Sequence, residues 1–417
     1  MTEFKKLNLS NRLMQTIEEE GYTTATPIQA QTIPALLDGK DVMGVAQTGT
    51  GKTAAFSLPL LHRMSATRDW AEPRQPHALI LAPTRELAVQ IHDSIKTYGK
   101  NLKLRSAVVF GGSSIRNQMK AMDKGVHILV ATPGRLMDLY NQKYVKFDGV
   151  QTFILDEGDR MLDMGFINDV KKIAAMMPSD RQTVLFSATM PKQVAKLAED
   201  LLDDPVRVSV DPESTTAERV EQKIYFLPKD RKRSLLGDLL KDPKLERVLV
   251  FTRTKRGADR VTKFLNQIEI SADAIHGDKK QSARQRALRD FKAGKIRALV
   301  ATDIAARGID VENVTHVINY ELPNEPESYV HRIGRTARGG AKGIALSLCD
   351  SEERAYLKAI EKATRQKLDV VVDHPFHAPE IAHAPTAPSK KDGRNKKMPW
   401  HQRRNAQSKK RKKKRAA

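Results

Sequence analysis

The chain has 417 residues, of which 40% are hydrophobic and 29% are charged, a composition typical of folded globular proteins. This length exceeds one ordinary domain, so we expect two folded domains and additional segments. The single cysteine, Cys349, excludes an intrachain disulfide and a cysteine-rich zinc site, and favours a reducing compartment. The N-terminus lacks a signal-peptide pattern and no apolar run has the length of a membrane span, which predicts a cytoplasmic protein without a membrane partner.

Positive charge is concentrated near the C-terminus. The whole chain has a net charge of +22, and residues 389–417 contain 14 Lys and Arg but one acid, a local net charge of +13 that leaves +9 for the rest. This sign is expected for a protein that meets phosphates. Charge alone does not separate nucleic acid from an anionic membrane as the partner.

Short β-branched apolar runs alternate with segments of helical period in both halves of the chain. This pattern predicts parallel strands beneath crossover helices, the doubly wound α/β fold. We expect strands at residues 42–46, 78–82, 106–110, 127–131, 152–156 and 183–188, and again at 247–251, 272–276, 297–301, 315–319 and 344–348. From composition we predict one lobe over residues 1–210, a linker over 211–217, a second lobe over 218–370 and a disordered basic tail over 371–417.

A glycine-containing segment follows the first expected strand and precedes a helical pattern. It reads Ala46, Gln47, Thr48, Gly49, Thr50, Gly51, Lys52 and Thr53, the P-loop form with Ala46 in place of the first Gly. The glycines allow backbone N–H groups to surround phosphates, the lysine neutralises the terminal phosphates, and the threonine hydroxyl can bind Mg²⁺. We therefore predict that this segment binds the phosphates of a nucleotide and that Lys52 acts in catalysis.

Two carboxylates follow another apolar run, at Asp156 and Glu157. A carboxylate at the tip of a buried strand beside a P-loop is where nucleotide hydrolases hold Mg²⁺, and its neighbour can orient the attacking water. We assign Asp156 to the metal, together with Thr53, and Glu157 to the water.

These two motifs resemble those of the DEAD-box family of ATP-dependent RNA helicases, and further motifs of that family occur in order across residues 4–338. The resemblance implies two tandem RecA-like lobes, and the sequence as a whole is most similar to the bacterial RhlE-type branch. One residue departs from the family pattern, because Gly158 stands where the family has Ala. All three carboxylates of the motif remain, so we expect activity to persist.

The resemblance also implies roles for residues of the first lobe. Gln29 would read the adenine edge, and Phe4 or Tyr22 would stack near the base. The residues expected to hold the RNA sugar-phosphate backbone are Arg85, Gly112, Thr132, Gly134 and Arg135. Ser187 and Thr189 would link the acidic motif to the RNA side, with Asp159 as their partner.

In the second lobe, the resemblance places Arg284 and Thr302 near RNA and Gly308 and Asp310 near the ribose. Arg335 and Arg338 would reach across the cleft to the γ-phosphate. Their i, i+3 spacing predicts that both lie on one helical face.

The predicted function is an ATP-dependent RNA helicase that couples ATP binding and hydrolysis to RNA clamping and local duplex separation. Two alternatives stay open: an ATP-dependent RNA clamp or chaperone with little unwinding, and a DNA helicase of the same superfamily. The basic tail is interpreted as an RNA tether, although such a run also resembles a nuclear signal or a solubilising segment. Ribosomal and RNA-decay assemblies are candidate partners.

Overall fold

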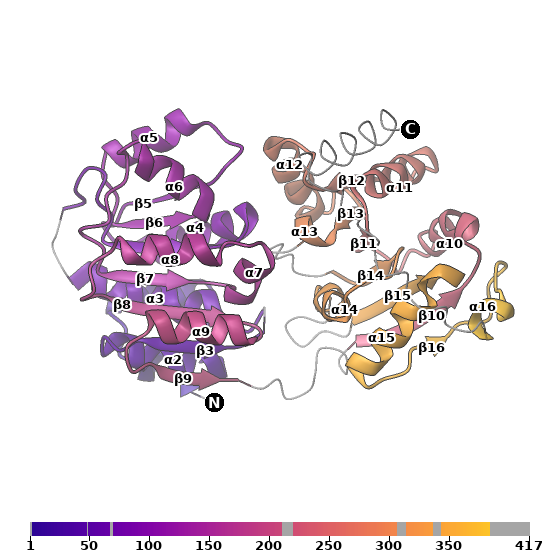
Figure 1. The fold of residues 1–417 in the computed structure, drawn as a ribbon, viewed down its shortest axis with the longest axis horizontal. Helices are drawn as coiled ribbons and strands as arrows, with labels where there is room; N and C mark the ends of the chain where they lie inside the picture. Colours follow the sequence, from indigo (N-terminus) through magenta and orange to yellow (C-terminus); the bar gives the residue numbers. More distant parts are fainter. Residues whose placement is uncertain are drawn as a thin grey trace, which may run out of the picture.

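The computed structural model describes residues 2–47, 49–66, 70–210, 220–306, 314–336 and 343–383. These residues form two α/β lobes that lie side by side, each built on a seven-stranded sheet with helices on both faces (Figure 1). A separate two-stranded antiparallel pair, β1 (Thr2–Glu3) with β2 (Thr24–Ala25), lies at the N-terminus. The predicted fold of two doubly wound parallel-sheet lobes is confirmed.

The sheet of lobe one is parallel throughout and has the spatial order β5-β6-β4-β7-β8-β3-β9. Its strands are β3 (Val42–Val45), β4 (Ala78–Leu81), β5 (Ser106–Val109), β6 (Ile128–Ala131), β7 (Thr152–Leu155), β8 (Gln182–Ser187) and β9 (Val206–Ser209). Strands β4, β6, β7 and β8 are fully buried, which explains why apolar residues occupy consecutive positions in each of them.

Helices cover both faces of this sheet and bury two separate hydrophobic clusters. One cluster includes side chains of α1 (Asn11–Glu19), α2 (Pro27–Leu37), α3 (Lys52–Ala66) and α4 (Arg85–Tyr98), preceded by the 3₁₀ turn η1 (Phe4–Leu7). The other includes side chains of α5 (Ile115–Asp123), α6 (Pro133–Asn141), α7 (Gly158–Asp163), α8 (Ile167–Ala175) and α9 (Lys192–Leu201).

Lobe two repeats the architecture, with the parallel order β12-β13-β11-β14-β15-β10-β16. Its strands are β10 (Val220–Phe226), β11 (Val248–Thr252), β12 (Ala272–Ile275), β13 (Ala298–Thr302), β14 (His316–Asn319), β15 (Gly343–Cys349) and β16 (Asp369–Val370). Its helical segments are η2 (Lys229–Arg231), α10 (Lys232–Leu239), α11 (Lys255–Gln267), α12 (Gln281–Lys292), α13 (Asp303–Ala306), α14 (Pro326–Ile333), η3 (Ser351–Glu353), α15 (Arg354–Thr364) and α16 (Pro379–His383). Numbered along the chain within each lobe, both sheets have the same strand order, so the two lobes are topological copies.

All eleven strands expected from the apolar runs are present, with ends that differ by at most one residue. Five strands were not predicted: β1, β2, β9, β10 and β16. Strand β10 alternates buried and exposed residues over its first half, and β9 and β16 lie at sheet edges, so none of them forms a continuous apolar run.

The predicted end of lobe two at residue 370 is wrong. Ala378 and Ile381 are buried in a hydrophobic cluster of lobe two, and Phe376 packs against another cluster. The Ala378 N–H also donates to the carbonyl of Phe226 at 3.0 Å. The lobe therefore extends at least to residue 383. Residues 384–417 and the predicted linker 211–217 lie outside the described residues.

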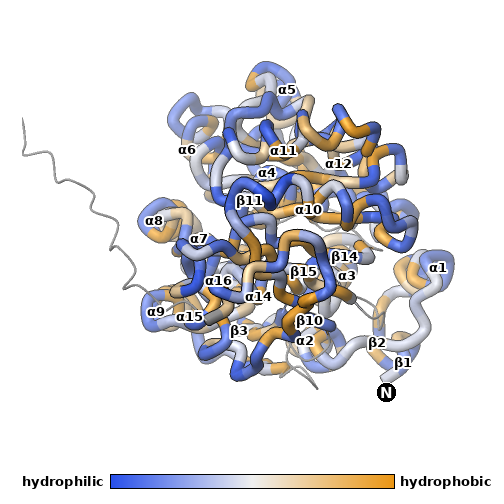
Figure 2. Tube along the Cα trace, turned by 90° about the vertical axis from the view of Figure 1, so that its right-hand side faces the viewer, coloured by the Kyte–Doolittle hydropathy of each residue, from blue (hydrophilic) through white to orange (hydrophobic). Residues whose placement is uncertain are grey.

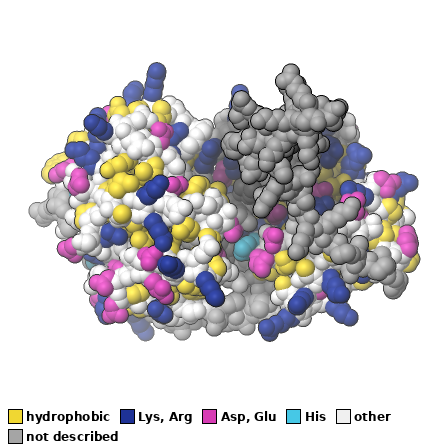
Figure 3. All heavy atoms as spheres, viewed as in Figure 1, with side chains coloured by type: hydrophobic (Ala, Val, Ile, Leu, Met, Phe, Trp, Pro, Cys, Tyr) yellow, Lys and Arg dark blue, Asp and Glu magenta, His cyan; other side chains and the backbone are white. Residues whose placement is uncertain are grey.

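The core is apolar and the surface is mixed in charge. In lobe two, hydrophobic stretches coincide with β10, β14 and β15 (Figure 2), and Cys349 at the end of β15 is fully buried. On the face shown in Figure 3, acidic and basic side chains lie among one another on both lobes. Among the helices of the described ranges, none combines the length and the apolar character needed to cross a membrane.

Candidate functional site

A loop with two left-handed glycines connects β3 to α3 at the carboxyl end of the lobe-one sheet. Gly49 and Gly51 have φ angles of +87° and +89°, which glycine adopts without the steric cost of a side chain. The loop is fixed by hydrogen bonds from Thr26 Oγ1 to the Thr50 carbonyl at 2.8 Å, from Gln29 Nε2 to the Gly51 carbonyl at 3.2 Å and from Lys52 Nζ to the Ala46 carbonyl at 2.8 Å. Backbone N–H groups of the loop and of the first turn of α3 provide an anion-binding surface.

Ala46, the departure from the P-loop form, fits its position. Its side chain is buried, and its N–H donates to the Ser187 carbonyl at 3.0 Å. Thr50 Oγ1 donates to the Gln47 carbonyl at 2.8 Å, which closes the turn. Thr53 lies half-buried in the first turn of α3, and Thr48 lies outside the described residues.

The residues expected to contact the base lie beside this loop. Gln29 is 6% exposed, and its Oε1 accepts a hydrogen bond from the Thr26 N–H at 2.9 Å. Phe4 is 2% exposed and stacks at 6.3 Å on Tyr22, which is 40% exposed. Of the two aromatic candidates, Tyr22 is therefore the one whose ring is accessible.

Two buried carboxylates follow β7. Asp156 is 2% exposed and Glu157 is 3% exposed. Burial raises the pKa of Asp156 to about 6, the charge of Glu157 adds to the rise, and Lys52 opposes it. A pair of desolvated carboxylates beside one lysine is the donor set that a hard divalent cation stabilises, so the residues present fit Mg²⁺.

A hydrogen-bonded cluster joins the acidic motif to the end of β8. The Asp159 N–H donates to Ser187 Oγ at 3.1 Å. The Thr189 N–H and Oγ1 both donate to Asp159 Oδ2, at 2.9 and 3.0 Å. The expected contact of Asp159 with this segment is therefore present.

The five residues expected to hold the RNA backbone all lie just after the carboxyl ends of strands in the lobe-one sheet. Gly112 has a φ of +80°, and a side chain there would overlap the guanidinium of Arg85. Arg135 Nη1 donates to the Ser113 carbonyl at 3.4 Å. Thr132 is buried before α6, and Gly134 has open space where a side chain would be.

The two lobes meet beside this edge. Glu86 Oε1 lies 2.9 Å from Arg284 Nη2 and accepts from Gln281 Nε2 at 3.1 Å, while Arg85 Nη1 donates to Gln281 Oε1 at 3.3 Å. The guanidinium of Arg284, expected to touch RNA, is thus paired across the lobe interface. A groove of about 470 Å³ lies here, lined by Arg85, Phe110, Gly112, Ser113, Lys279, Lys280, Gln281, Ser282 and Gln285.

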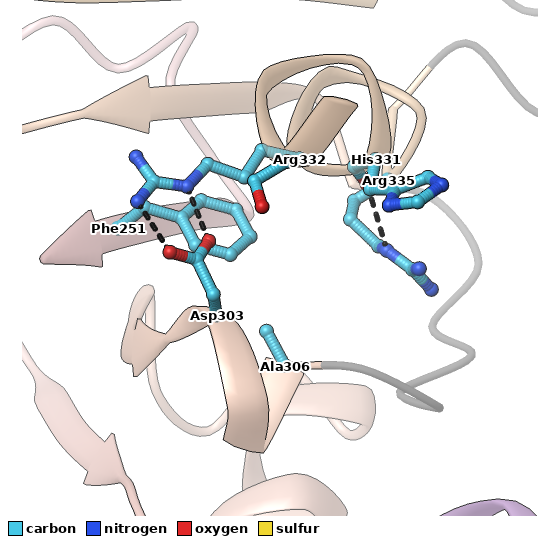
Figure 4. Close-up of a pocket in the computed structure, with 7 residues that line it drawn as sticks. Phe251, Asp303, Ala306, His331, Arg332 and Arg335 are labelled. Atoms are coloured by element: carbon cyan, nitrogen blue, oxygen red, sulfur yellow. Dashed lines mark hydrogen bonds and ion pairs between the residues drawn. The ribbon is translucent and has the colours of Figure 1, made fainter. Parts of the chain in front are cut away.

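A buried arginine organises the corresponding edge of lobe two (Figure 4). Arg332 Nε and Nη2 donate to Asp303 Oδ1 and Oδ2 at 2.5 and 2.8 Å, and the guanidinium lies 4.9 Å from the Phe251 ring centre. Arg335 lines the same small pocket, and its Nε donates to the His331 carbonyl at 3.2 Å. Thr302 is buried at the end of β13.

The prediction of a helical face for Arg335 is wrong. Helix α14 ends at Ile333 with Gly334 as its C-cap, so Arg335 lies in the turn that follows. The Gly334 N–H still donates to the Val330 carbonyl at 3.0 Å, but the Arg335 N–H donates to the Arg332 carbonyl at 3.1 Å, the three-residue spacing of a tighter turn. Arg338, Gly308 and Asp310 lie outside the described residues.

Comparisons with known proteins agree with this geometry. The model described as DEAD/DEAH box helicase matches residues 26–197, and the helicase conserved C-terminal domain matches residues 231–340. The DEAD-box ATP-dependent RNA helicase CshA of Bacillus cereus is 44% identical over 369 residues, which cover 88% of this chain and 69% of the relative. This chain belongs to the DEAD-box RNA helicase family. CshA of Bacillus subtilis is also 44% identical, over 88% of this chain and 73% of that protein.

Two solved structures have an overall fold similar to that of this chain. S. cerevisiae Dbp5 bound to RNA and ADP BeF3 is 30% identical, with a TM-score of 0.78 over 89% of this chain and 96% of that chain. Mss116p bound to ssRNA and AMP-PNP is 29% identical, with a TM-score of 0.79 over 91% and 80%. Both neighbours hold a nucleotide and RNA at once.

Three residues of this DEAD-box site were not predicted from the sequence. Glu86 joins the lobes, Tyr98 extends the aromatic contact of Tyr22 at a ring distance of 6.3 Å, and Arg160 pairs with Glu157 at 2.8 Å. Glu86 follows Arg85 directly within an RNA-contact motif, and this position is a sequence signal that could have identified it as a site residue. No local pattern predicts the other two contacts.

Proposed function

We propose that this protein is an RNA-stimulated ATP hydrolase that clamps RNA between its lobes and separates short duplexes locally. The observation that carries the proposal is the position of the phosphate loop and acidic pair on the sheet edge of lobe one where Glu86 and Arg85 contact lobe two. A ligand on one side of this edge can therefore alter the contact of the lobes on the other side. Membership in the DEAD-box family supports the same reading.

ATP is proposed to bind at the β3–α3 loop. Backbone N–H groups made accessible by Gly49 and Gly51 contact the phosphates, and Lys52 neutralises them after leaving the Ala46 carbonyl. Gln29 and Tyr22 contact the adenine, supported by the bond of Gln29 to the loop and by the exposed ring of Tyr22. Gly308 and Asp310 are proposed to contact the ribose.

Hydrolysis is proposed to use Glu157. It orients a water and accepts its proton while the water oxygen bonds to the γ-phosphorus and the bond to the ADP oxygen breaks. Thr53 and Asp156 would hold Mg²⁺, which supplies charge neutralisation of the phosphates when bound. Arg335 and Arg338 from lobe two would contact the γ-phosphate, so that closure of the lobes is required for rapid turnover.

RNA is proposed to lie along the adjoining edge of lobe one and in the interlobe groove. Arg85, Arg135, Thr132 and backbone groups near Gly112 and Gly134 would contact the sugar-phosphate backbone, with Thr302 from lobe two. Contacts of this kind position RNA with little sequence preference. Arg284 acts through Glu86 in this proposal, because its guanidinium is already engaged there.

The test is ATP hydrolysis by the full chain with and without single-stranded RNA. We expect RNA to raise the rate, Glu157→Gln to abolish it nearly completely, and Arg335→Ala to remove RNA stimulation without unfolding. Glu199→Gln, an exposed change on α9, is the matched control. Equal hydrolysis with and without RNA would contradict the proposal.

Two alternatives are distinguished by further assays. An RNA clamp or chaperone would bind and anneal RNA with ATP but would not separate a short duplex, with or without residues 389–417. A DNA helicase would be competed at least as well by a DNA strand as by the matched RNA strand, whereas an RNA helicase that contacts the 2′-OH would be competed better by RNA.

Finer assignments are also proposals. The overall sequence resemblance supports the RhlE-type branch, and the bacterial relatives support a bacterial family member. A single, buried cysteine supports action in the cytoplasm. The basic block supports a tether to RNA, with ribosomal or RNA-decay assemblies as candidate settings.

A further inference from the structure

A buried ion pair holds the carboxylate proposed to orient the attacking water. Arg160 Nη1 lies 2.8 Å from Glu157 Oε2, and both side chains are 4% exposed. The Arg160 N–H also donates to the Glu157 carbonyl at 3.0 Å. Glu157 is therefore held at its side chain and its backbone by one residue.

The backbone of Glu157 has an unusual conformation. Its φ is +57°, the left-handed region that residues other than glycine seldom adopt, and it lies between β7 and α7. Such conformations persist where surrounding contacts fix them, and they cluster at functional sites. On the side of α7, the contacts with Arg160 fix this residue together with the Met161 N–H, which donates to the Glu157 carbonyl at 3.0 Å.

Arg160 is also tied to the end of β8. Asp159 Oδ1 accepts from the Arg160 N–H at 3.0 Å, while Asp159 Oδ2 accepts from Thr189. Ser187 Oγ accepts from the Asp159 N–H and donates to the Thr189 carbonyl at 2.6 Å. Hydrogen bonds thus connect Thr189 to the Asp159 carboxylate and that carboxylate to the Arg160 backbone N–H. The Arg160 side chain then reaches the Glu157 carboxylate.

The chemistry of the pair suits orientation of one carboxylate. The interaction engages Oε2, and the planar guanidinium fixes the direction of a carboxylate better than a lysine ammonium does. A general base must be held within hydrogen-bond reach of the proton it accepts, and small displacements are costly to the rate. Pairs of opposite charge at i, i+3 are usually exposed and weak, whereas this one is buried.

We infer that Arg160 is a positioning residue for ATP hydrolysis: it holds the Glu157 carboxylate toward the attacking water and links that carboxylate to the Ser187–Thr189 segment. This inference rests on the proposed role of Glu157. Movement of the Ser187–Thr189 segment when RNA binds would thereby be transmitted through Asp159 and Arg160 to the Glu157 carboxylate.

The experiment compares Arg160→Gln and Arg160→Lys in the full chain with saturating RNA. Arg160→Gln should lower kcat about 10–100-fold, the scale of a misplaced catalytic group, with KM for ATP and affinity for a non-hydrolysable ATP analogue changed less than about twofold. Arg160→Lys should recover part of kcat because it restores the charge. Arg63→Gln, a half-buried arginine of α3, is the control for loss of an arginine in the same lobe.

Three results would overturn the inference. They are an unchanged kcat in a folded Arg160→Gln protein, an equal loss of analogue affinity and kcat, and no recovery by lysine. A double-mutant cycle with Ser187→Ala tests the link, and additive effects on kcat would refute that part. Glu157→Gln separates the two proposals: if it stays active, the proposed role of Glu157 fails, and if it is inactive while Arg160→Gln is active, the positioning inference alone fails.

Discussion

The departure of the acidic motif from the family pattern can be tested by restoring the alanine. A methyl group at Gly158 would lie 3.5 Å from Val194 Cγ1, 3.7 Å from Leu185 Cδ2 and 3.7 Å from the Phe186 carbonyl, which are ordinary van der Waals distances. Gly158 begins α7 and has no positive φ, so alanine fits its backbone. A compatible Gly→Ala change stabilises by about 0.4–1 kcal/mol, chiefly by restricting the unfolded chain.

We therefore expect Gly158→Ala to raise the Tm of lobe one by roughly 1–4 °C, at about 2–4 °C per kcal/mol for a lobe of this size. Thermal unfolding followed by circular dichroism measures the shift. RNA-stimulated ATP hydrolysis should change by less than about tenfold, because no carboxylate moves and nothing is displaced. Gly112→Ala is the matched control and should lower Tm, because its φ of +80° and the Arg85 guanidinium oppose a side chain. A fall in Tm for Gly158→Ala, or a loss of activity like that of Glu157→Gln, would refute the reasoning.

Three further predictions concern the charged groups. Burial raises the pKa of Asp156 from an ordinary 3.8 to about 6. When no nucleotide or metal is bound, the ionised carboxylate therefore lowers the free energy of unfolding above pH 6 by up to about 3 kcal/mol. Asp156→Asn should therefore raise Tm at pH 8, raise it less at pH 5 and abolish hydrolysis; a lower Tm at pH 8 would contradict this. Glu86→Arg should lower RNA-stimulated kcat at least about tenfold, because it places a second cation beside Arg284. The double variant Glu86→Arg with Arg284→Glu should restore part of kcat, and no recovery would show that the contact at 2.9 Å does not contribute to turnover. Deleting residues 389–417 should weaken RNA binding and flatten its salt dependence, measured by fluorescence anisotropy, while kcat at saturating RNA stays the same.

The sequence was informative wherever a strand is buried on both faces. Runs such as 78–82 and 153–155 are apolar throughout because neither face of these strands is in contact with water, and all such runs lie in strands. Strand β10 was missed because Glu221 and Lys223 interrupt its apolar residues. Edge strands need only one apolar side, so their composition resembles that of a loop.

The C-terminal boundary was missed for a related reason. Residues 371–383 are rich in Pro and His, which favoured disorder. However, Ala378 and Ile381 are buried and Phe376 packs against a hydrophobic cluster, so the segment is attached to lobe two. A few apolar residues are sufficient when the surface that covers them already exists. Composition averaged over a segment does not report such a surface.

The phosphate loop, the acidic pair and the RNA-contact residues of lobe one could be placed at one sheet edge from the sequence, because each of these segments follows a strand. Their partners could not be predicted. Gln281 and Glu86 are 195 residues apart in the chain, and only the packing of two lobes brings them together. The pairing of Arg160 with Glu157 depends on the left-handed backbone conformation of Glu157, which the neighbouring sequence does not predict.

The isolated cysteine at the end of β15 makes the protein convenient for optical measurements. Burial raises the pKa of the Cys349 thiol to about 12, and the side chain has no exposed surface, so maleimide dyes should not react with it in the folded state. One engineered surface cysteine in each lobe would then carry donor and acceptor dyes without removal of the native thiol. Single-molecule energy transfer between them would report how often the lobes separate and rejoin during each cycle of ATP turnover.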